Sequence, residues 1–223
     1  MTERKTTVTV PDLIAWLRRT GELMAEHAVE LSDLDSAIGD GDHGTNMKRG
    51  FAAVAGVLDE DFETVDALLK RVGSTLVSSV GGASGPLYGT FYLRMGTSQK
   101  GATELDAASL LGAMSTGVEG IEARGKAGIG EKTMLDAWMP ALEAFGRAGG
   151  SLADALRAGA EAAAAGRDAT EPMVATKGRA SYLGERSAGH IDPGAASTAL
   201  IWQAAVETLA GGSDTGSDDG AAS

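Results

Sequence analysis

The chain has 223 residues with a formal net charge of −12, 43% hydrophobic and 4% aromatic residues, and no cysteine. This length fits one large domain or two small ones, and the many small side chains allow helices to approach closely. The negative charge argues against nucleic-acid binding and against an anionic membrane surface, and the lack of cysteine excludes disulfides and thiolate metal sites. No apolar run approaches ~18 residues and no N-terminal signal region is visible, so we expect a cytoplasmic protein without a membrane span.

Helical spacing of apolar residues recurs along the chain and predicts an all-α protein. The first helix begins near Thr9, Pro11 and Asp12, which supply a capping hydroxyl, an early proline and an acid in the first turn. It continues to the acidic residues near position 35, and seven more helices are expected at about 45–58, 63–76, after Ser84, 106–124, 133–145, 151–160 and 193–209. Residues 6–10 could form a strand, but it would have no partner, so no sheet is expected.

The stretch from Asp35 to Asn46 carries three aspartates and three glycines and gives the strongest functional signal. Its G-x-G-x-x-G spacing fails as a dinucleotide fingerprint because a helix precedes it, and it fails as an EF-hand because Gly44 occupies a ligand position. Carboxylates beside a phosphate would repel it unless a cation lay between them. Asp35, Asp40 and Asp42 are therefore candidate magnesium ligands. A polar turn that caps the next helix is the simpler alternative.

Three other loops combine glycine with polar or basic residues. In residues 80–90 the small side chains would let the backbone approach a ligand, and Ser84 could cap the next helix and donate to phosphate, although tight helix packing through glycine explains them equally well. The 125–133 loop resembles a P-loop but lacks its hydroxyl and ends a helix, so it is either a basic loop beside a nucleotide or a solvated loop. Residues 177–186 contain two arginines without helical periodicity.

These four loops, at 39–45, 81–85, 125–133 and 177–193, follow every second helix. In an up-and-down bundle or barrel of eight helices, such loops lie at one end, so they are expected to form one site. Residues 1–210 would form this domain. The Gly/Ser/Asp-rich tail, residues 211–223, has nothing to bury and is expected to be disordered.

Four motifs, in order, resemble the L subunit of dihydroxyacetone kinase. The motifs are residues 34–44, residues 81–89, Gly125-Lys126-Ala127 with Lys132-Thr133-Met134, and residues 178–186 with Asp192-Pro193-Gly194. The match spans about residues 10–211. The resemblance implies a barrel of eight antiparallel helices, in which a nucleotide (ADP or ATP) binds at one end.

The resemblance also implies a role for particular residues. The motif aspartates, here Asp35, Asp40 and Asp42, bind two Mg²⁺ ions that hold the diphosphate. The remaining nucleotide contacts would be His43, Gly44, Thr45, Asn46, Ala83, Ser84, Gly125, Met134, Arg179, Asp192, Pro193 and Gly194. Arg179 is also the candidate catalytic residue, because a guanidinium can offset charge on a transferring phosphoryl group. The simpler alternative is a surface arginine in a solvated loop.

The implied activity is phosphoryl transfer, for which positioning and charge neutralisation supply most of the catalysis. In the family, a separate K subunit holds dihydroxyacetone covalently through a histidine, and a phosphocarrier M subunit of the phosphoenolpyruvate system recharges the bound ADP. This chain has only His27, His43 and His190 and no second domain, so it resembles half an enzyme. Two alternatives remain: a subunit that exchanges ATP and serves another ketose or a sugar acid, and a binding module whose nucleotide state is read by a regulator.

Overall fold

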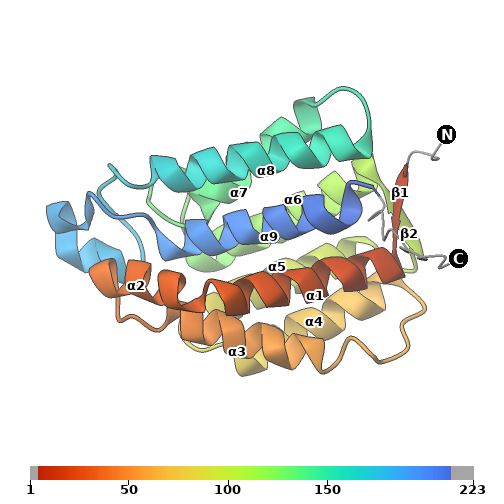
Figure 1. The fold of residues 1–223 in the computed structure, drawn as a ribbon, viewed down its shortest axis with the longest axis horizontal. Helices are drawn as coiled ribbons and strands as arrows, with labels where there is room; N and C mark the ends of the chain where they lie inside the picture. The colour runs from red at the N-terminus through yellow and green to blue at the C-terminus, as the bar shows by residue number, and fades with distance from the viewer. Residues whose placement is uncertain (1–4, 212–223) are drawn as a thin grey trace, which may run out of the picture.

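The computed structural model describes residues 5–211, which form nine α-helices, one 3₁₀ helix and two short strands (Figure 1). The helices are α1 Val10–Glu26, α2 Ala28–Ile38, α3 His43–Ala55, α4 Val65–Ser79, α5 Ser84–Ser98, α6 Ala107–Gly125, α7 Leu135–Arg147, α8 Leu152–Ala169 and α9 Pro193–Leu209, and the 3₁₀ helix η1 is Arg179–Ser187. The all-α prediction is confirmed. The predicted disordered tail, apart from its first residue, lies outside the described residues.

Helices that follow one another in the chain pack side by side. From α3 to α9 each helix contacts the next, α3 also packs on α1, and α9 returns to α1, so the helices follow a closed order around a shared core. The predicted second to eighth helices are confirmed as α3 to α9, with their ends shifted by a few residues and α8 extended to Ala169. The core between them includes three fully buried tryptophans, Trp16, Trp138 and Trp202.

The prediction of one continuous first helix is wrong. The helix is interrupted at His27, which separates α1 from α2. The interruption coincides with a close approach of α3, because a Cβ placed on Gly44 would lie 1.9 Å from the backbone oxygen of Ala28. The predicted helix start is confirmed, since Thr9 and Asp12 form a capping box at the beginning of α1.

The prediction that no sheet forms is also wrong. Strand β1, Thr7–Thr9, pairs antiparallel with β2, Glu104–Asp106, and Val8 lies opposite Leu105. The partner strand comes from the connection between α5 and α6, about a hundred residues away in the sequence, which local periodicity does not reveal. This small sheet lies at the end of the helices opposite to η1 and the beginning of α9 (Figure 1).

Glycines bring α4 and α5 into close contact. A Cβ on Gly89 would lie 2.4 Å from the Val77 side chain and 2.9 Å from the backbone oxygen of Gly73. The glycine-packing explanation of residues 80–90 is therefore confirmed for Gly89. The beginning of the same stretch, residues 81–84, lines a pocket, so a ligand role for these residues stays open.

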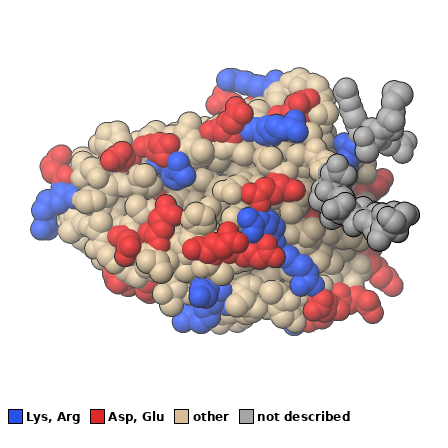
Figure 2. Space-filling view, in the orientation of Figure 1, with Lys and Arg blue, Asp and Glu red and all other residues tan. Residues whose placement is uncertain are grey.

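The surface mixes acidic and basic side chains. Figure 2 shows this on the face formed by α1, α8 and α9, where Arg19 contacts Glu22, Glu26 and Glu207 and so joins α1 to α9. Within residues 5–211, every helix is too short or too polar to cross a bilayer.

Candidate functional site

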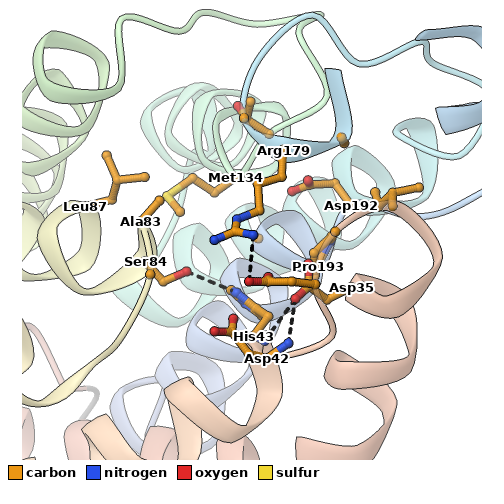
Figure 3. A pocket seen from close by; sticks show the side chains of 18 of the residues that line it. Asp35, Asp42, His43, Ala83, Ser84, Leu87, Met134, Arg179, Asp192 and Pro193 are labelled. Carbon is orange, nitrogen blue, oxygen red and sulfur yellow. Dashed lines mark hydrogen bonds and ion pairs between the residues drawn. The ribbon is translucent and has the colours of Figure 1, made fainter. Parts of the chain in front are cut away.

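The four glycine-containing loops line one pocket at the end of the helices opposite to the sheet (Figures 1 and 3). The pocket has a cavity volume of about 170 Å³ and opens to solvent at its mouth. Its lining comes from residues far apart in the chain: Asp35, Ile38, Gly39, Asp40, Asp42, His43, Gly81, Gly82, Ala83, Ser84, Leu87, Lys132, Thr133, Met134, Lys177, Gly178, Arg179, Ala180, Asp192, Pro193 and Gly194. The predicted convergence of the loops is therefore observed.

Three carboxylates meet on one side of the pocket. One oxygen each from Asp35, Asp40 and Asp42 can be chosen so that all three lie within 4.8 Å of one another. Hydrogen bonds also hold the carboxylate of Asp35 in place: its Oδ2 accepts from the backbone N–H groups of Asp42 (2.9 Å) and His43 (3.1 Å). Burial raises the pKa of the Asp35 carboxyl above its usual value, and the charges of Asp40 and Asp42 add to this effect. A cation placed among the three oxygens would offset both effects.

Arg179 provides a positive charge at this cluster in the ligand-free structure. Its Nη1 lies 2.8 Å from Oδ2 of Asp40, and both side chains are partly exposed. Figure 3 shows the guanidinium extending from η1 toward the carboxylates. The guanidinium is therefore paired with a carboxylate while it stays largely exposed, which agrees with the predicted site role and with the surface-arginine alternative alike. The segment that carries it is not irregular, since residues 179–187 form a 3₁₀ helix with a kink at Gly184.

Helices α3, α5, α7 and α9 all begin at this end of the molecule, next to the pocket. Each helix N-terminus carries partial positive charge and free backbone N–H groups, so the four together favour an anionic ligand. Asp192 caps α9, with its Oδ2 accepting from Ala195 N at 2.7 Å. By contrast, Ala83 precedes α5 as an N-cap without a side-chain cap, and Ala83 and Ser84 line the pocket, so backbone N–H groups at this helix start are available to a ligand.

The glycines before α5 let the backbone pass close to the carboxylates. Gly82 has φ of +65°, which favours glycine, and a Cβ placed there would lie 3.9 Å from Oδ1 of Asp42. At the neighbouring Gly81, a Cβ would lie 2.8 Å from Oδ1 of Asn46. The uncapped start of α5 and the carboxylate cluster are thus parts of the same surface.

The opposite side of the pocket is apolar. Ala83, Leu87 and Met134 lie there (Figure 3) and continue into an adjoining apolar pocket that also contains Ile121 and Gly125. A ligand that spans both pockets would meet charged and polar groups at one end and hydrocarbon at the other.

His43 joins three helix beginnings through hydrogen bonds. Its Nδ1 lies 3.1 Å from the hydroxyl of Ser84 on α5, and its Nε2 lies 2.9 Å from the hydroxyl of Ser197 on α9. The Ser197 hydroxyl is in turn 2.7 Å from the buried hydroxyl of Tyr88, which also contacts Thr198 at 3.0 Å. Burial lowers the pKa of His43 to about 4, so its imidazole is neutral at pH 7.

Some of the predicted contact residues lie outside the pocket lining. Gly44 packs against α2, Thr45 faces a separate groove between α2 and α3, and Asn46 is buried with its Oδ1 2.8 Å from Arg49 Nη2. Gly125 belongs to the adjoining apolar pocket. The remaining predicted residues all line the main pocket, namely Asp35, Asp40, Asp42, His43, Ala83, Ser84, Met134, Arg179, Asp192, Pro193 and Gly194.

The prediction that Ser84 caps α5 is wrong, because Ala83 occupies the N-cap position and the Ser84 hydroxyl bonds to His43 instead. Sequence reasoning also missed Tyr88 and Ser197, which support His43 from within two helices. Their helical positions look like ordinary core positions, and only their hydroxyl groups give a signal.

The comparisons with known proteins identify the family. Residues 37–207 match the DAK2 domain. The chain is 47% identical over 197 residues to the ADP-binding subunit DhaL of PEP-dependent dihydroxyacetone kinase 1 from Listeria innocua, covering 87% of this chain and 94% of the relative. It is 42% identical over 198 residues to the ADP-binding subunit DhaL of the Escherichia coli PEP-dependent dihydroxyacetone kinase, covering 86% and 93%. The chain therefore belongs to the DAK2 domain family.

A solved structure shows the same fold. The crystal structure of the dihydroxyacetone kinase from C. freundii in complex with AMP-PNP and Mg²⁺ matches with a TM-score of 0.70 and 26% identity. The match covers 92% of this chain and 35% of that kinase, so the chain spans about a third of it. The predicted resemblance to dihydroxyacetone kinase L subunits, and with it the prediction of a phosphotransferase, is confirmed.

Proposed function

We propose that this chain is the nucleotide-bearing subunit of a dihydroxyacetone kinase. It would hold a magnesium-bound nucleotide and transfer a phosphoryl group to dihydroxyacetone on a separate K subunit, and a phosphoenolpyruvate-dependent phosphocarrier would recharge the bound nucleotide. The observation that carries this proposal is the meeting of three carboxylates, four helix beginnings and an arginine in one pocket. With α1 and α2 counted as one interrupted helix, the closed packing order supports an eight-helix barrel with the nucleotide at one end.

The carboxylate cluster fits magnesium. Its donors are oxygens only, and they lie close enough together to share a cation, whose charge would offset the burial of Asp35 and the repulsion among the three carboxylates. Asp35, Asp40 and Asp42 would hold two Mg²⁺ ions, which when bound supply positive charge between the carboxylates and the phosphates. The backbone amides of Asp42 and His43 keep Asp35 in place for this task.

The rest of the pocket divides between phosphate and base. The uncapped beginning of α5, with Gly81 and Gly82 before it, offers backbone N–H groups for phosphate oxygens next to Asp42. Leu87 and Met134 offer an apolar surface for the planar base. The neutral His43 does not add charge; its Nδ1 bonds to Ser84 at the phosphate end of the pocket, and its Nε2 bonds to Ser197 on α9.

Arg179 is the proposed catalytic residue. It enters the pocket from η1, whose residues remain partly exposed at the mouth, so its guanidinium could follow a phosphoryl group toward an acceptor on another protein. A planar guanidinium pairs with phosphate oxygens and stabilises charge that develops during transfer. His43, the histidine that lines this pocket, has both ring nitrogens hydrogen-bonded to hydroxyl groups of the same chain. This supports a separate K subunit for the acceptor.

A reconstituted assay tests the proposal. The purified chain is combined with a K subunit, a phosphocarrier with its phosphoenolpyruvate-dependent donors, Mg²⁺ and dihydroxyacetone, and each component is omitted in turn. We expect turnover only in the complete mixture. Turnover without the K subunit would contradict the half-enzyme proposal, and turnover with free ATP in place of the carrier would support the ATP-exchanging alternative. Nucleotide binding without turnover in any mixture would support the regulatory module.

A further inference from the structure

Lys132 is a buried lysine whose role in the site is not explained by the proposed nucleotide contacts. Its side chain is 1% exposed, although lysine is almost never fully buried without partners. Its backbone φ is +61°, a left-handed conformation that is uncommon for residues other than glycine. Burial lowers the pKa of its ammonium group. A residue that carries both backbone strain and a buried charge must be held by strong local interactions.

These interactions are hydrogen bonds to four backbone carbonyls. The Nζ of Lys132 lies 2.8 Å from the oxygen of Thr170, 3.3 Å from that of Glu171, 3.0 Å from that of Met173 and 2.5 Å from that of His190. An ammonium group has three N–H donors and no acceptor, so carbonyl oxygens on several sides are its natural partners. The four carbonyls come from both ends of the segment that connects α8 to α9.

Lys132 therefore closes the base of this connecting segment, residues 170–191. Two backbone-donated bonds act at the same place: Gly189 N donates to Glu171 O at 2.7 Å, and Asp192 N donates to the Thr170 hydroxyl at 2.9 Å. The two ends of the connecting segment are thus held together by hydrogen bonds. Its base depends on a side chain from a different loop, the one at 126–134.

The other end of the segment reaches the carboxylate cluster. Ala180 and Leu183 on η1 pack against Ile38 at the end of α2, and Arg179 contacts Asp40. The tip is thus held by a small apolar contact and a partly exposed ion pair, both weaker than the base. The position of Arg179 follows from where the base is fixed.

Asp136 fixes Lys132 itself. Its Oδ2 accepts from Thr133 N at 2.7 Å and its Oδ1 accepts from Gly130 N at 2.5 Å, so the loop that carries Lys132 is bound to the beginning of α7. The path from α7 to Arg179 therefore runs through Asp136, Lys132 and the connecting segment, and each step is a hydrogen bond or a covalent link.

We propose that Lys132 is a positioning residue that holds the Arg179-bearing segment over the carboxylate cluster. This inference rests on the proposed function for the role of Arg179, but the contact that it describes is independent of any activity. In a purely stabilising role, Lys132 would affect folding without acting through Arg179. In a direct ligand role, which its place in the pocket lining allows, it would change nucleotide affinity first.

The test uses four single variants and one double variant. Lys132→Met removes the ammonium group and keeps the side-chain length, and Lys132→Gln keeps two N–H donors in case the methionine variant does not fold. Lys126→Met is the matched control, because Lys126 is exposed, lies in the same loop and also has positive φ, at +50°. Arg179→Ala supplies the reference for loss of the guanidinium.

Amide hydrogen exchange in the ligand-free protein measures how often the connecting segment opens, and it requires no assay of activity. In Lys132→Met or Lys132→Gln, we expect exchange in residues 174–189 to become at least ~10-fold faster, since a closed segment opens locally, while exchange in α4 and α5 stays near wild type. Lys126→Met should exchange like wild type throughout. Unchanged exchange in residues 174–189 in both Lys132 variants would overturn the proposal even if the proposed function holds.

A double-mutant cycle reads the coupling to Arg179 in the transfer assay. We expect the rate of phosphoryl transfer by the Lys132 variant to fall at least ~10-fold, while its Mg-ADP dissociation constant stays within ~3-fold of wild type. The double variant with Arg179→Ala should be no slower than the slower of the two single variants. Multiplicative losses would show that Lys132 does not act through Arg179. A dissociation constant raised more than ~10-fold with unchanged maximal transfer would assign Lys132 to the ligand instead. If the wild-type chain transfers no phosphate, the proposed function fails and the exchange result alone decides on Lys132.

Discussion

Nη1 of Arg179 lies 2.8 Å from Oδ2 of Asp40, so the proposed catalytic arginine forms an ion pair with a proposed metal ligand. The side chains are 65% and 37% exposed, and an ion pair this exposed to solvent contributes little to stability. The pair can therefore open at small cost when a cation takes its place on Asp40. Arg179 would then be free to bind the phosphates of the nucleotide. Its side chain would thus pair with Asp40 without nucleotide and with phosphate when Mg-nucleotide is bound.

Replacing Arg179 with alanine should separate catalysis from folding. Because the pair is exposed, we expect the unfolding free energy of Arg179→Ala to stay within ~0.5 kcal/mol of wild type. Phosphoryl transfer should fall at least ~10-fold, which corresponds to ~1.4 kcal/mol of barrier. Arg186→Ala, at an exposed position of the same 3₁₀ helix outside the pocket lining, is the control and should keep full activity. Full transfer in the Arg179 variant would return this residue to a surface role.

Nucleotide binding should require magnesium and the carboxylate cluster. Without a cation the three carboxylates would repel a diphosphate, so we expect calorimetry to show Mg-ADP binding that EDTA abolishes. Asp40→Asn should weaken binding at least ~10-fold, since one charged ligand is lost. Asp33→Asn is the matched control, because Asp33 is an exposed acid on the same helix as Asp35 and outside the cluster. Equal affinity with and without EDTA would rule out the metal-bridged site.

Bound nucleotide should stabilise the fold. The pocket is lined by four separate connections, which bury little on their own, so a ligand that contacts them all binds only the folded state. At a hundredfold excess of Mg-ADP over its dissociation constant, the free energy of unfolding should rise by ~2.7 kcal/mol. Thermal unfolding with Mg-ADP, with ADP in EDTA and with Mg²⁺ alone measures this. A melting temperature that does not respond to Mg-ADP would mean that the loops do not share a ligand.

The sequence predicted most of the helices and the meeting of the loops because both depend on local signals. Apolar periodicity gives helix positions, and alternation of loops along an up-and-down chain gives their common end. The three aspartates could be chosen because carboxylates beside a phosphate would need a cation between them. Their roles and those of the other predicted contact residues stay predictions.

What the sequence did not predict depends on contacts between distant residues. The break at His27 occurs where Gly44 approaches α2, and β1 finds its partner after α5. The local pattern places Lys132 in a basic loop, yet its ammonium group is buried among carbonyls that lie about forty to sixty positions later in the chain. A lysine next to glycine gives the same local pattern whether it is solvated or buried.

Asp192 should make the ligand-free protein less stable as pH rises. Burial raises the pKa of its carboxyl to about 7, from a usual value near 4, although the nearby ammonium of Lys132 acts in the opposite direction. The folded state therefore holds a proton between about pH 4 and pH 7 that the unfolded state releases. Stability linked to this proton is present below about pH 4 and is lost as pH rises toward 7.

The Asp192→Asn variant isolates this effect, because asparagine can still accept the hydrogen bond from Ala195 but cannot ionise. In urea unfolding at about pH 4.5, 6 and 7.5, the stability of the variant relative to wild type should increase with pH by a few kcal/mol, since one pKa unit corresponds to ~1.4 kcal/mol. Asp106→Asn is the control, and its difference in stability from wild type should stay nearly constant over this pH range. Asp106 also caps a helix, α6, but the hydrogen bond from the Ser109 backbone lowers its pKa, so the exposed Asp106 stabilises the folded state above about pH 4. A difference between Asp192→Asn and wild type that stays constant across this range would show that Asp192 is already ionised in the folded protein at pH 4.5.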